Sequence, residues 1–250
     1  PLIMEPHHRQ RQENLQFDEN GIFSKKIFGN LYKCDCGELR EEGWCEECGT
    51  RVIDPKRMPD FFIDLNCEVL VAYPDMQRAH RLPDGKWNRR IKPGVDELEN
   101  IARYRSFVYL DKVVTREATV DEETGEVIRK EEAEIGPSYQ VVSWLDEDGK
   151  PRDGDEWDQS RVLIGRDALL HVGVAKEWID EHLVDFLLVP HTCFRPMIIT
   201  NGKPFITPLN DKYSKIIARV NAVHELQAVA KGRPLYLLSS YKVISDLYHD

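Results

Sequence analysis

Four cysteines lie close together in the first fifth of the chain, at Cys34, Cys36, Cys45 and Cys48. Thiolates are soft ligands, and four of them about 2.3 Å from one ion suit Zn²⁺. The spacing is Cys-x-Cys, then eight residues, then Cys-x-x-Cys, so each of two turns can present two sulfurs to the same ion. Because sulfur fills all four positions, no place remains for a catalytic water. The pattern predicts one structural zinc ion.

Other interpretations of the four thiols stay open at this point. Disulfides would need an oxidising compartment, a rubredoxin-like iron would use the same four sulfurs, and the thiols could also be unrelated to one another. Gly37 and Gly49 each closely follow a cysteine pair and permit the positive φ that such turns often use. Without an HExxH motif, a zinc hydrolase is disfavoured. Cys67 and Cys193 stand outside the pattern and are predicted to be ordinary buried or partly buried thiols.

Composition indicates a folded protein with an uneven charge. Hydrophobic residues make up 41% of the 250, enough for a core, and no apolar run approaches the roughly 18 residues of a transmembrane helix. No signal peptide opens the chain. Six cysteines in a chain of this length do not suggest a secreted disulfide scaffold, so we expect a reducing compartment. The net charge is −10, yet residues 117–158 alone carry fifteen acids and four bases. Residues 78–92 instead carry six Lys or Arg and one Asp, which indicates either a solvated loop or a loop that faces phosphates.

Sequence periodicity predicts the elements that surround the cysteines. Residues 57–73 are rich in aromatic and β-branched side chains and indicate strands. Residues 95–110 indicate a helix followed by an extended segment. The acidic part, 115–160, predicts an exposed β-hairpin that turns at Thr124–Gly125, followed by further turns. Residues 165–183 carry an apolar stripe typical of a core-facing helix.

The C-terminal part predicts two helices that pack against each other. Apolar residues recur at spacings of 4, 3, 4 and 3, the seam of a coiled coil. The first seam consists of Leu209, Tyr213, Ile216, Val220 and Val223, and the second of Leu237, Tyr241, Ile244 and Tyr248. "KGRP" at 231–234 separates them, so an antiparallel helical hairpin is expected over 209–250. Its tip could be a docking surface, or the helices could pack as an ordinary bundle.

The segments around the cysteines carry a resemblance to a known family. "NGIFSKKIFGN", the four cysteines and "KRMPDFFIDL", all within residues 18–65, resemble the N-terminal region of the largest (β′) subunit of multisubunit DNA-dependent RNA polymerase. Residues 95–114 and 187–221 resemble two later β′ segments in the same order. Departures are the short spacing between cysteine pairs, Asn201–Gly202–Lys203–Pro204 where the family has a double glycine, and the acidic excursion. The family's metal-binding "NADFDGD" motif does not occur in the sequence.

The resemblance implies an α+β fold, a multi-part clamp module with a zinc ribbon, a mixed β/α body and a helical hairpin, the clamp coiled-coil. It implies part of a divergent, split and virus-encoded subunit that holds template DNA and nascent RNA. The enzyme would be a nucleotidyltransferase whose catalytic aspartates and Mg²⁺ lie outside this chain. The implied divisions are an N-terminal segment at 1–30, a zinc ribbon at 31–56, a clamp body at 57–190, a lid loop at 191–211 and the hairpin at 209–250.

Five residues are carried over as nucleic-acid contacts. Arg195 and Lys203 would contact phosphates, and Phe205 would stack on a base or pack against its own loop. Lys215 and Arg219 would face nucleic acid or an initiation factor, or form a solvated helix face. The implied partners are a β-like subunit, the rest of β′, a σ-like factor, DNA and RNA, without a membrane. The expected location is the cytoplasm (of a host if viral, with the virion as a further place), and the alternative function is a stand-alone zinc-ribbon regulator of transcription.

Overall fold

The computed structural model describes residues 21–38, 42–82, 84–120, 127–201 and 203–249. The chain forms two compact units, each assembled from segments that are distant in the sequence. The first unit consists of Pro1–Glu68, Val184–Glu225 and Asp246–Asp250, and the second of Val69–Leu183 and Leu226–Ser245. Among the described residues, no helix is both long and apolar enough to cross a membrane.

The first unit begins with a short helix and a small sheet that carry the cysteines. Ser24 is the N-cap of helix α1 (Lys25–Phe28), and its hydroxyl accepts a hydrogen bond from the Ile27 amide. Strand β3 (Arg51–Ile53) is the centre of the sheet and pairs in parallel with β1 (Asn30–Leu31) and antiparallel with β2 (Gly43–Trp44). A turn of 3₁₀ helix, η1 (Pro55–Arg57), follows the sheet.

The rest of the first unit is built around a buried strand. In β4 (Phe62–Leu70), Ile63, Leu65 and Cys67 alternate inward, as expected for a strand with one face on the core. Strand β4 pairs with β8 (Leu183–Leu188), and both strands cross from one unit to the other at their ends. The chain continues through η4 (Thr192–Phe194), β9 (Ile198–Thr200), β10 (Lys203–Phe205) and α6 (Pro208–Val229).

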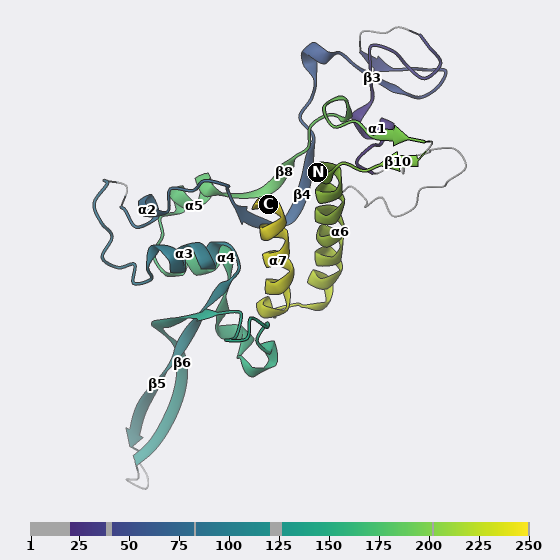
Figure 1. The fold of residues 1–250 in the computed structure, drawn as a ribbon. Helices are drawn as coiled ribbons and strands as arrows, with labels where there is room; N and C mark the ends of the chain where they lie inside the picture. Colours follow the sequence, from purple (N-terminus) through teal and green to yellow (C-terminus); the bar gives the residue numbers. More distant parts are fainter. Residues whose placement is uncertain (1–20, 39–41, 83, 121–126, 202, 250) are drawn as a thin grey trace. The chain divides into compact units, whose positions relative to one another are not determined.

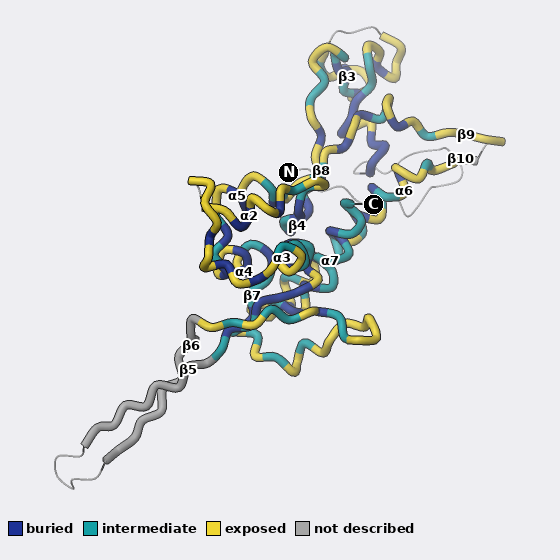
Figure 2. The backbone as a smooth tube through the Cα atoms, turned by 60° about the vertical axis from the view of Figure 1, so that its left-hand side comes forward, coloured by how far each residue is buried: buried dark blue, intermediate teal, exposed yellow. Residues whose placement is uncertain are grey.

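The second unit contains a core of buried aliphatic residues. It packs α3 (Val95–Ala102), α4 (Gly165–His171) and α5 (Lys176–His182) around buried aliphatic residues, with α2 (Met76–Ala79) beside them. Figure 2 shows buried backbone around α3, α4 and β7 (Val162–Leu163). The single helix expected over 165–183 is wrong. Gly173 has a φ of 98°, which ends α4 and separates it from α5, although the expected stripe is still mostly buried.

A long β-hairpin extends from this unit (Figure 1). Strand β5 (Ser106–Val120) pairs antiparallel with β6 (Val127–Ser143), from Ser106 opposite Ser143 to Val120 opposite Val127. The predicted hairpin is confirmed for its strands, while the predicted turn at 124–125 lies outside the described residues. The short 3₁₀ segments η2 (Gly154–Glu156) and η3 (Gln159–Arg161) lead from the hairpin to β7, which pairs with β5.

The expected helices of the C-terminal hairpin are confirmed, with a different set of buried residues in the second. Helix α7 (Pro234–His249) follows α6 after a short connection. Gln227 Nε2 of α6 donates a hydrogen bond of 3.0 Å to the Tyr241 hydroxyl of α7. In α7, Ile244 is the one residue of the predicted seam that is buried, and the other buried apolar residues are Leu235 and Leu238. They pack in an aromatic cluster with Tyr104, Phe107 and Trp144.

Candidate metal centre

Two turns bring the four cysteine sulfurs together beside β2 and β3. All four sulfurs lie within 4.8 Å of one another. The Cys34 and Cys36 sulfurs are 2.9 Å apart, and those of Cys36 and Cys45 are 3.6 Å apart. A tetrahedral ion with sulfur bonds of about 2.3 Å holds its ligands about 3.8 Å apart. The two separations given are somewhat shorter than this, and the limit of 4.8 Å lies about 1 Å above it. All six cysteines are free thiols, so no disulfide competes for them. The donor set therefore fits a single metal ion.

The backbone of both turns fixes the sulfurs in place. The Gly37 amide donates to the Cys34 carbonyl at 3.1 Å, and the Gly49 amide donates to the Cys45 carbonyl at 2.8 Å. The two glycines have φ values of 97° and 66°, which confirms the positive φ expected from the sequence. Cys34 and Cys45 are buried against Val52 of β3. The small sheet is thus the platform on which both turns rest.

A chain of polar contacts links the second turn to α1. The Cys48 sulfur lies 3.4 Å from the Thr50 hydroxyl, which donates to Asp35 at 3.0 Å. Asp35 in turn accepts hydrogen bonds from Lys25 at 2.6 Å and from Asn30 at 3.0 Å. Lys25 lowers the pKa of the Asp35 carboxyl, so this carboxylate is charged at neutral pH. Polar neighbours of this kind orient metal ligands. Neither Asp35, between Cys34 and Cys36, nor Thr50, two residues after Cys48, is predicted from the sequence as a neighbour of the metal ligands.

The thiols differ in how readily they lose a proton. Hydrogen bonds with the side chain and backbone of Thr50 lower the pKa of the Cys48 thiol to about 6. The hydrogen bond that Cys36 makes with the adjacent Cys34 sulfur raises the pKa of the Cys36 thiol to about 12, because this bond favours the protonated form of Cys36. Two thiolates this close would also repel each other. A divalent cation removes that repulsion and favours the thiolate form of all four. The other two cysteines differ from each other: Cys67 is buried, which raises its thiol pKa to about 12, and Cys193 is exposed.

Arg195 lies in a place that does not suit the expected phosphate contact. Its side chain is buried, and its guanidinium donates to the carbonyls of Pro190 and Ile22 at 2.8 and 2.5 Å. It also donates to Asn210 Oδ1 at 3.2 Å, and its carbonyl accepts a bond from the Asn210 amide. The guanidinium lies 4.7 Å from the Phe28 ring centroid. Arg195 therefore holds together three segments of the first unit, which corrects the expectation.

The other four carried-over residues lie on β10 and α6. Strand β10 pairs antiparallel with β9, with Lys203 opposite Thr200, and Phe205 at its end is 56% exposed. On α6, Lys215 and Arg219 are both exposed and are one turn apart. Lys215 pairs with Asp211 at 2.7 Å. Arg219 forms no ion pair with any residue that the structure describes. These residues do not converge on the metal centre.

Comparison with known proteins identifies distant relatives. The chain is 23% identical over 269 residues to the DNA-directed RNA polymerase subunit beta′ of Liriodendron tulipifera, 24% over 273 residues to that of Nandina domestica and 25% over 272 residues to that of Ceratophyllum demersum. Each alignment covers 87% of this chain and 39% of the relative, so the chain spans about two fifths of the relatives' length. No protein-family model matches it. Over most of its length, the chain is a distant homologue of these subunits.

Proposed function

We propose that this chain forms the N-terminal part of the β′-like subunit of a DNA-directed RNA polymerase. The observation that carries the proposal is the alignment with β′ subunits over 87% of the chain. The metal-binding geometry supports it independently, because a closed four-thiol site is typical of structural zinc rather than of a catalytic centre. In this proposal the chain contributes architecture to a nucleotidyltransferase. The catalytic aspartates and their Mg²⁺ belong to a part of the subunit outside this sequence.

The proposed metal is one structural zinc ion held by Cys34, Cys36, Cys45 and Cys48. Bound zinc would join two turns that are otherwise connected by the small sheet, a few buried side chains and the hydrogen bond from Thr50 to Asp35. Structural zinc contributes roughly 10–16 kcal/mol in isolated zinc-finger peptides, far more than so small a core can supply. This zinc ribbon would keep a nucleic-acid-facing surface in a fixed shape. It would take no part in bond formation.

The β9–β10 hairpin is the proposed lid, which separates template DNA from nascent RNA. Phe205 is exposed at its end and can stack on a base, an interaction worth about 1–3 kcal/mol. Lys203 is the proposed phosphate contact on the same strand. Arg195 is not a contact in this proposal. It fixes the base of the hairpin, because it ties η4 to Asn210 of α6 and to the Ile22 carbonyl.

The C-terminal helices are the proposed clamp coiled-coil and docking site for a σ-like initiation factor. Lys215 and Arg219 form a basic face on α6 that can meet acidic groups of such a factor or a nucleic-acid backbone. The remaining proposed partners are a β-like subunit, the rest of β′, template DNA and nascent RNA.

Reconstituted transcription tests this assignment. The β-like subunit, the remainder of β′ and the other subunits would be assembled with and without this chain, on a scaffold of template DNA and an RNA primer. We expect extension of the primer only with the chain present. The alternative, a stand-alone zinc-ribbon regulator, expects full extension without it, and that result would contradict the proposal.

A further inference from the structure

The basic loop, residues 78–92, belongs to none of the segments on which the β′ resemblance rests. It carries six Lys or Arg and one Asp, a balance of +5 in a chain whose net charge is −10. It connects α2 to α3 within the second unit. A charge of this kind on a disordered surface loop would need no explanation. This loop instead has a defined structure.

The loop is held in a defined shape by its own backbone. Arg81 and Trp87 form an antiparallel bridge, and the Leu82 amide donates to the Lys86 carbonyl at 2.8 Å. Between them the chain turns at Gly85, which has a φ of 82°. The Asn88 side chain then donates to the Gly173 carbonyl at 3.1 Å, which anchors the loop to the core helices. The backbone of the described loop residues, 78–82 and 84–92, is therefore held in a defined arrangement.

Trp87 is an exposed aromatic residue with one face of its ring covered by another side chain. Its indole stacks on the His80 imidazole, with centroids 4.8 Å apart and planes 4° from parallel. His80 itself is buried, and burial lowers the pKa of its ring, so it supports the indole as a neutral flat surface. The Trp87 side chain is nonetheless 54% exposed. One face is thus covered and orders the ring, while the rest is open to a ligand.

Four of the loop's six cations are engaged within the protein and two are not. Arg81 donates to the Gly85 carbonyl, and the Lys92 amine lies 5.9 Å from the Tyr139 ring centroid. Arg78 pairs with Glu181 at 2.9 Å, and Lys86 pairs with Asp84 at 3.0 Å. Arg89 and Arg90 lie three and four residues after Lys86. Both are exposed, and neither makes an ion pair with the described residues. They follow Trp87 after a single buried residue. Unpaired charge and the exposed ring therefore lie in one short stretch.

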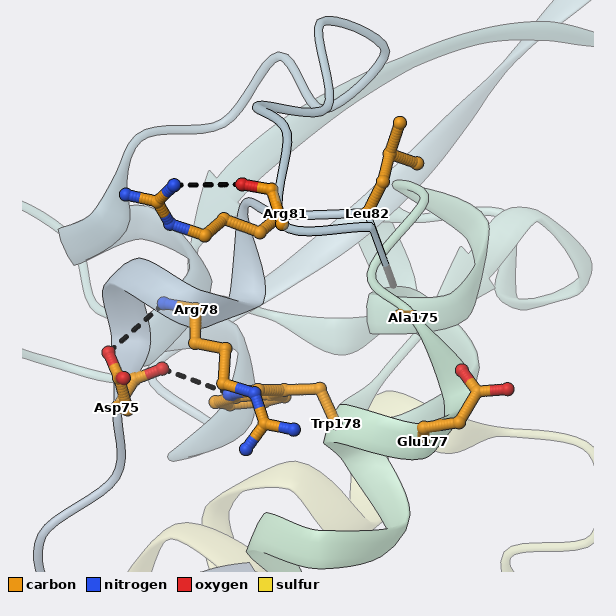
Figure 3. A pocket seen from close by; sticks show the side chains of 8 residues that line it. Asp75, Arg78, Arg81, Leu82, Ala175, Glu177 and Trp178 are labelled. Carbon is orange, nitrogen blue, oxygen red and sulfur yellow. Dashed lines mark hydrogen bonds between the residues drawn. The ribbon is translucent and has the colours of Figure 1, made fainter.

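A pocket of about 510 Å³ next to the loop is not the anion site (Figure 3). Arg78 and Arg81 line it, but Asp75 and Glu177 line it too, so its formal charges balance. Arg81 also donates to the Gly85 carbonyl at 2.8 Å. The pocket's arginines therefore brace the loop, which leaves Trp87 and the two unpaired arginines as the binding surface.

We propose that this surface binds single-stranded nucleic acid, with phosphates on Arg89 and Arg90 and an unstacked base on Trp87. Cations close to phosphates release counterions, and aromatic rings stack on bases of any sequence. A duplex keeps its bases stacked, so no base is available to stack on Trp87. An acidic protein segment has no base that could stack on the indole. The inference goes beyond the polymerase assignment and holds for the isolated chain whether or not that assignment is right.

Fluorescence anisotropy of the zinc-loaded full chain tests the proposal. The probes are fluorescein-labelled 12-mers of oligothymidylate and oligouridylate, and a 12-base-pair duplex. We expect both single strands to bind more tightly than the duplex. R89E/R90E should weaken single-strand binding at least tenfold and reduce the slope of log K against log salt by about 1.4, or 0.7 for each phosphate lost. The matched control K150E/K231E makes the same charge change at two exposed lysines elsewhere in the second unit and should change binding less than threefold.

The stacking contact has its own variant. Trp87→Ala should weaken binding by about 5- to 150-fold, the range for one stacked base, without changing the salt slope. Trp87→Phe should restore much of it, which separates stacking from a folding defect. Equal affinities for R89E/R90E and its control, a duplex bound as tightly as the single strands, or full affinity in Trp87→Ala would each overturn the proposal. So would tighter binding to polyglutamate than to the oligonucleotides, because an acidic protein segment would then be the ligand.

Discussion

Replacement of Arg195 with methionine tests whether this buried side chain stabilises the base of the β9–β10 hairpin. The guanidinium is only 2% exposed and donates to Pro190, Ile22 and Asn210. Burial lowers its pKa to about 10, which still leaves it charged at neutral pH. Methionine keeps much of the volume but removes every donor. Two carbonyls and one side-chain amide oxygen would then lose the partner they have in the folded state.

The expected loss is about 3–5 kcal/mol of the first unit's unfolding free energy. Hydrogen bonds from a charged donor contribute about 1.5–3 kcal/mol each, and a buried group without its partner costs about 1–3 kcal/mol. Because the three bonds share one side chain, they do not add, and the estimate stays near the cost of breaking a buried ionic contact. Hydrogen–deuterium exchange of the peptides around residues 22–28 and 208–216 measures this directly. Protected amides there should exchange roughly 100- to 5,000-fold faster, since about 1.4 kcal/mol corresponds to a factor of ten.

Arg219→Met is the matched control for this variant. It makes the same chemical change on α6, at an exposed arginine that has no ion pair in the described part of the chain. Exposed substitutions of this type usually change stability by less than about 0.5 kcal/mol. Equal exchange rates in the two variants would refute the structural role of Arg195 and would restore it as a candidate for contact with phosphates.

Three further predictions concern the metal, pH and the lid. Cys45→Ser should lower bound zinc from about one ion per chain to none by mass spectrometry and unfold the ribbon, with the helical circular dichroism largely kept; a folded ribbon without metal would contradict the assignment. Burial lowers the pKa of His80 and His191 in the folded state, so the unfolded chain binds protons at these residues more readily. The stability to urea should therefore fall as the pH drops below about 6.5. A flat stability profile between pH 7.5 and 5 would contradict this. Phe205→Ala in the reconstituted enzyme should lengthen the RNA–DNA hybrid mapped by nuclease protection, and an unchanged hybrid would remove this residue from the lid.

Local chemistry made the metal centre predictable from the sequence. Four thiols at this spacing need two turns, and Gly37 and Gly49 supply the positive φ that these turns adopt in the structure. The same is true of the strands of the acidic hairpin and of the two C-terminal helices, whose periodicity and turn residues are local signals. In each case the feature is determined by residues within a few positions of one another.

Contacts between distant residues were not predictable in the same way. Arg195 is buried because Ile22 lies beside it, 173 residues away in the sequence, and no local pattern records that proximity. Leu235 and Leu238 of α7 are buried against aromatic residues such as Trp144, so of the predicted seam only Ile244 is buried and tertiary packing determines the rest of the buried face. The break at Gly173 was missed because a single glycine is tolerated within a helical pattern.

Purification of the tagged chain from its native source, with quantitative mass spectrometry of what accompanies it, tests the polymerase assignment most directly. We expect a stable complex in which this chain, a β-like subunit and a polypeptide with the catalytic "NADFDGD" motif occur in equal amounts. No other polypeptide in the complex should supply a β′ N-terminal region. A monomeric chain, or a polymerase that already contains its own β′ N-terminal region, would contradict it.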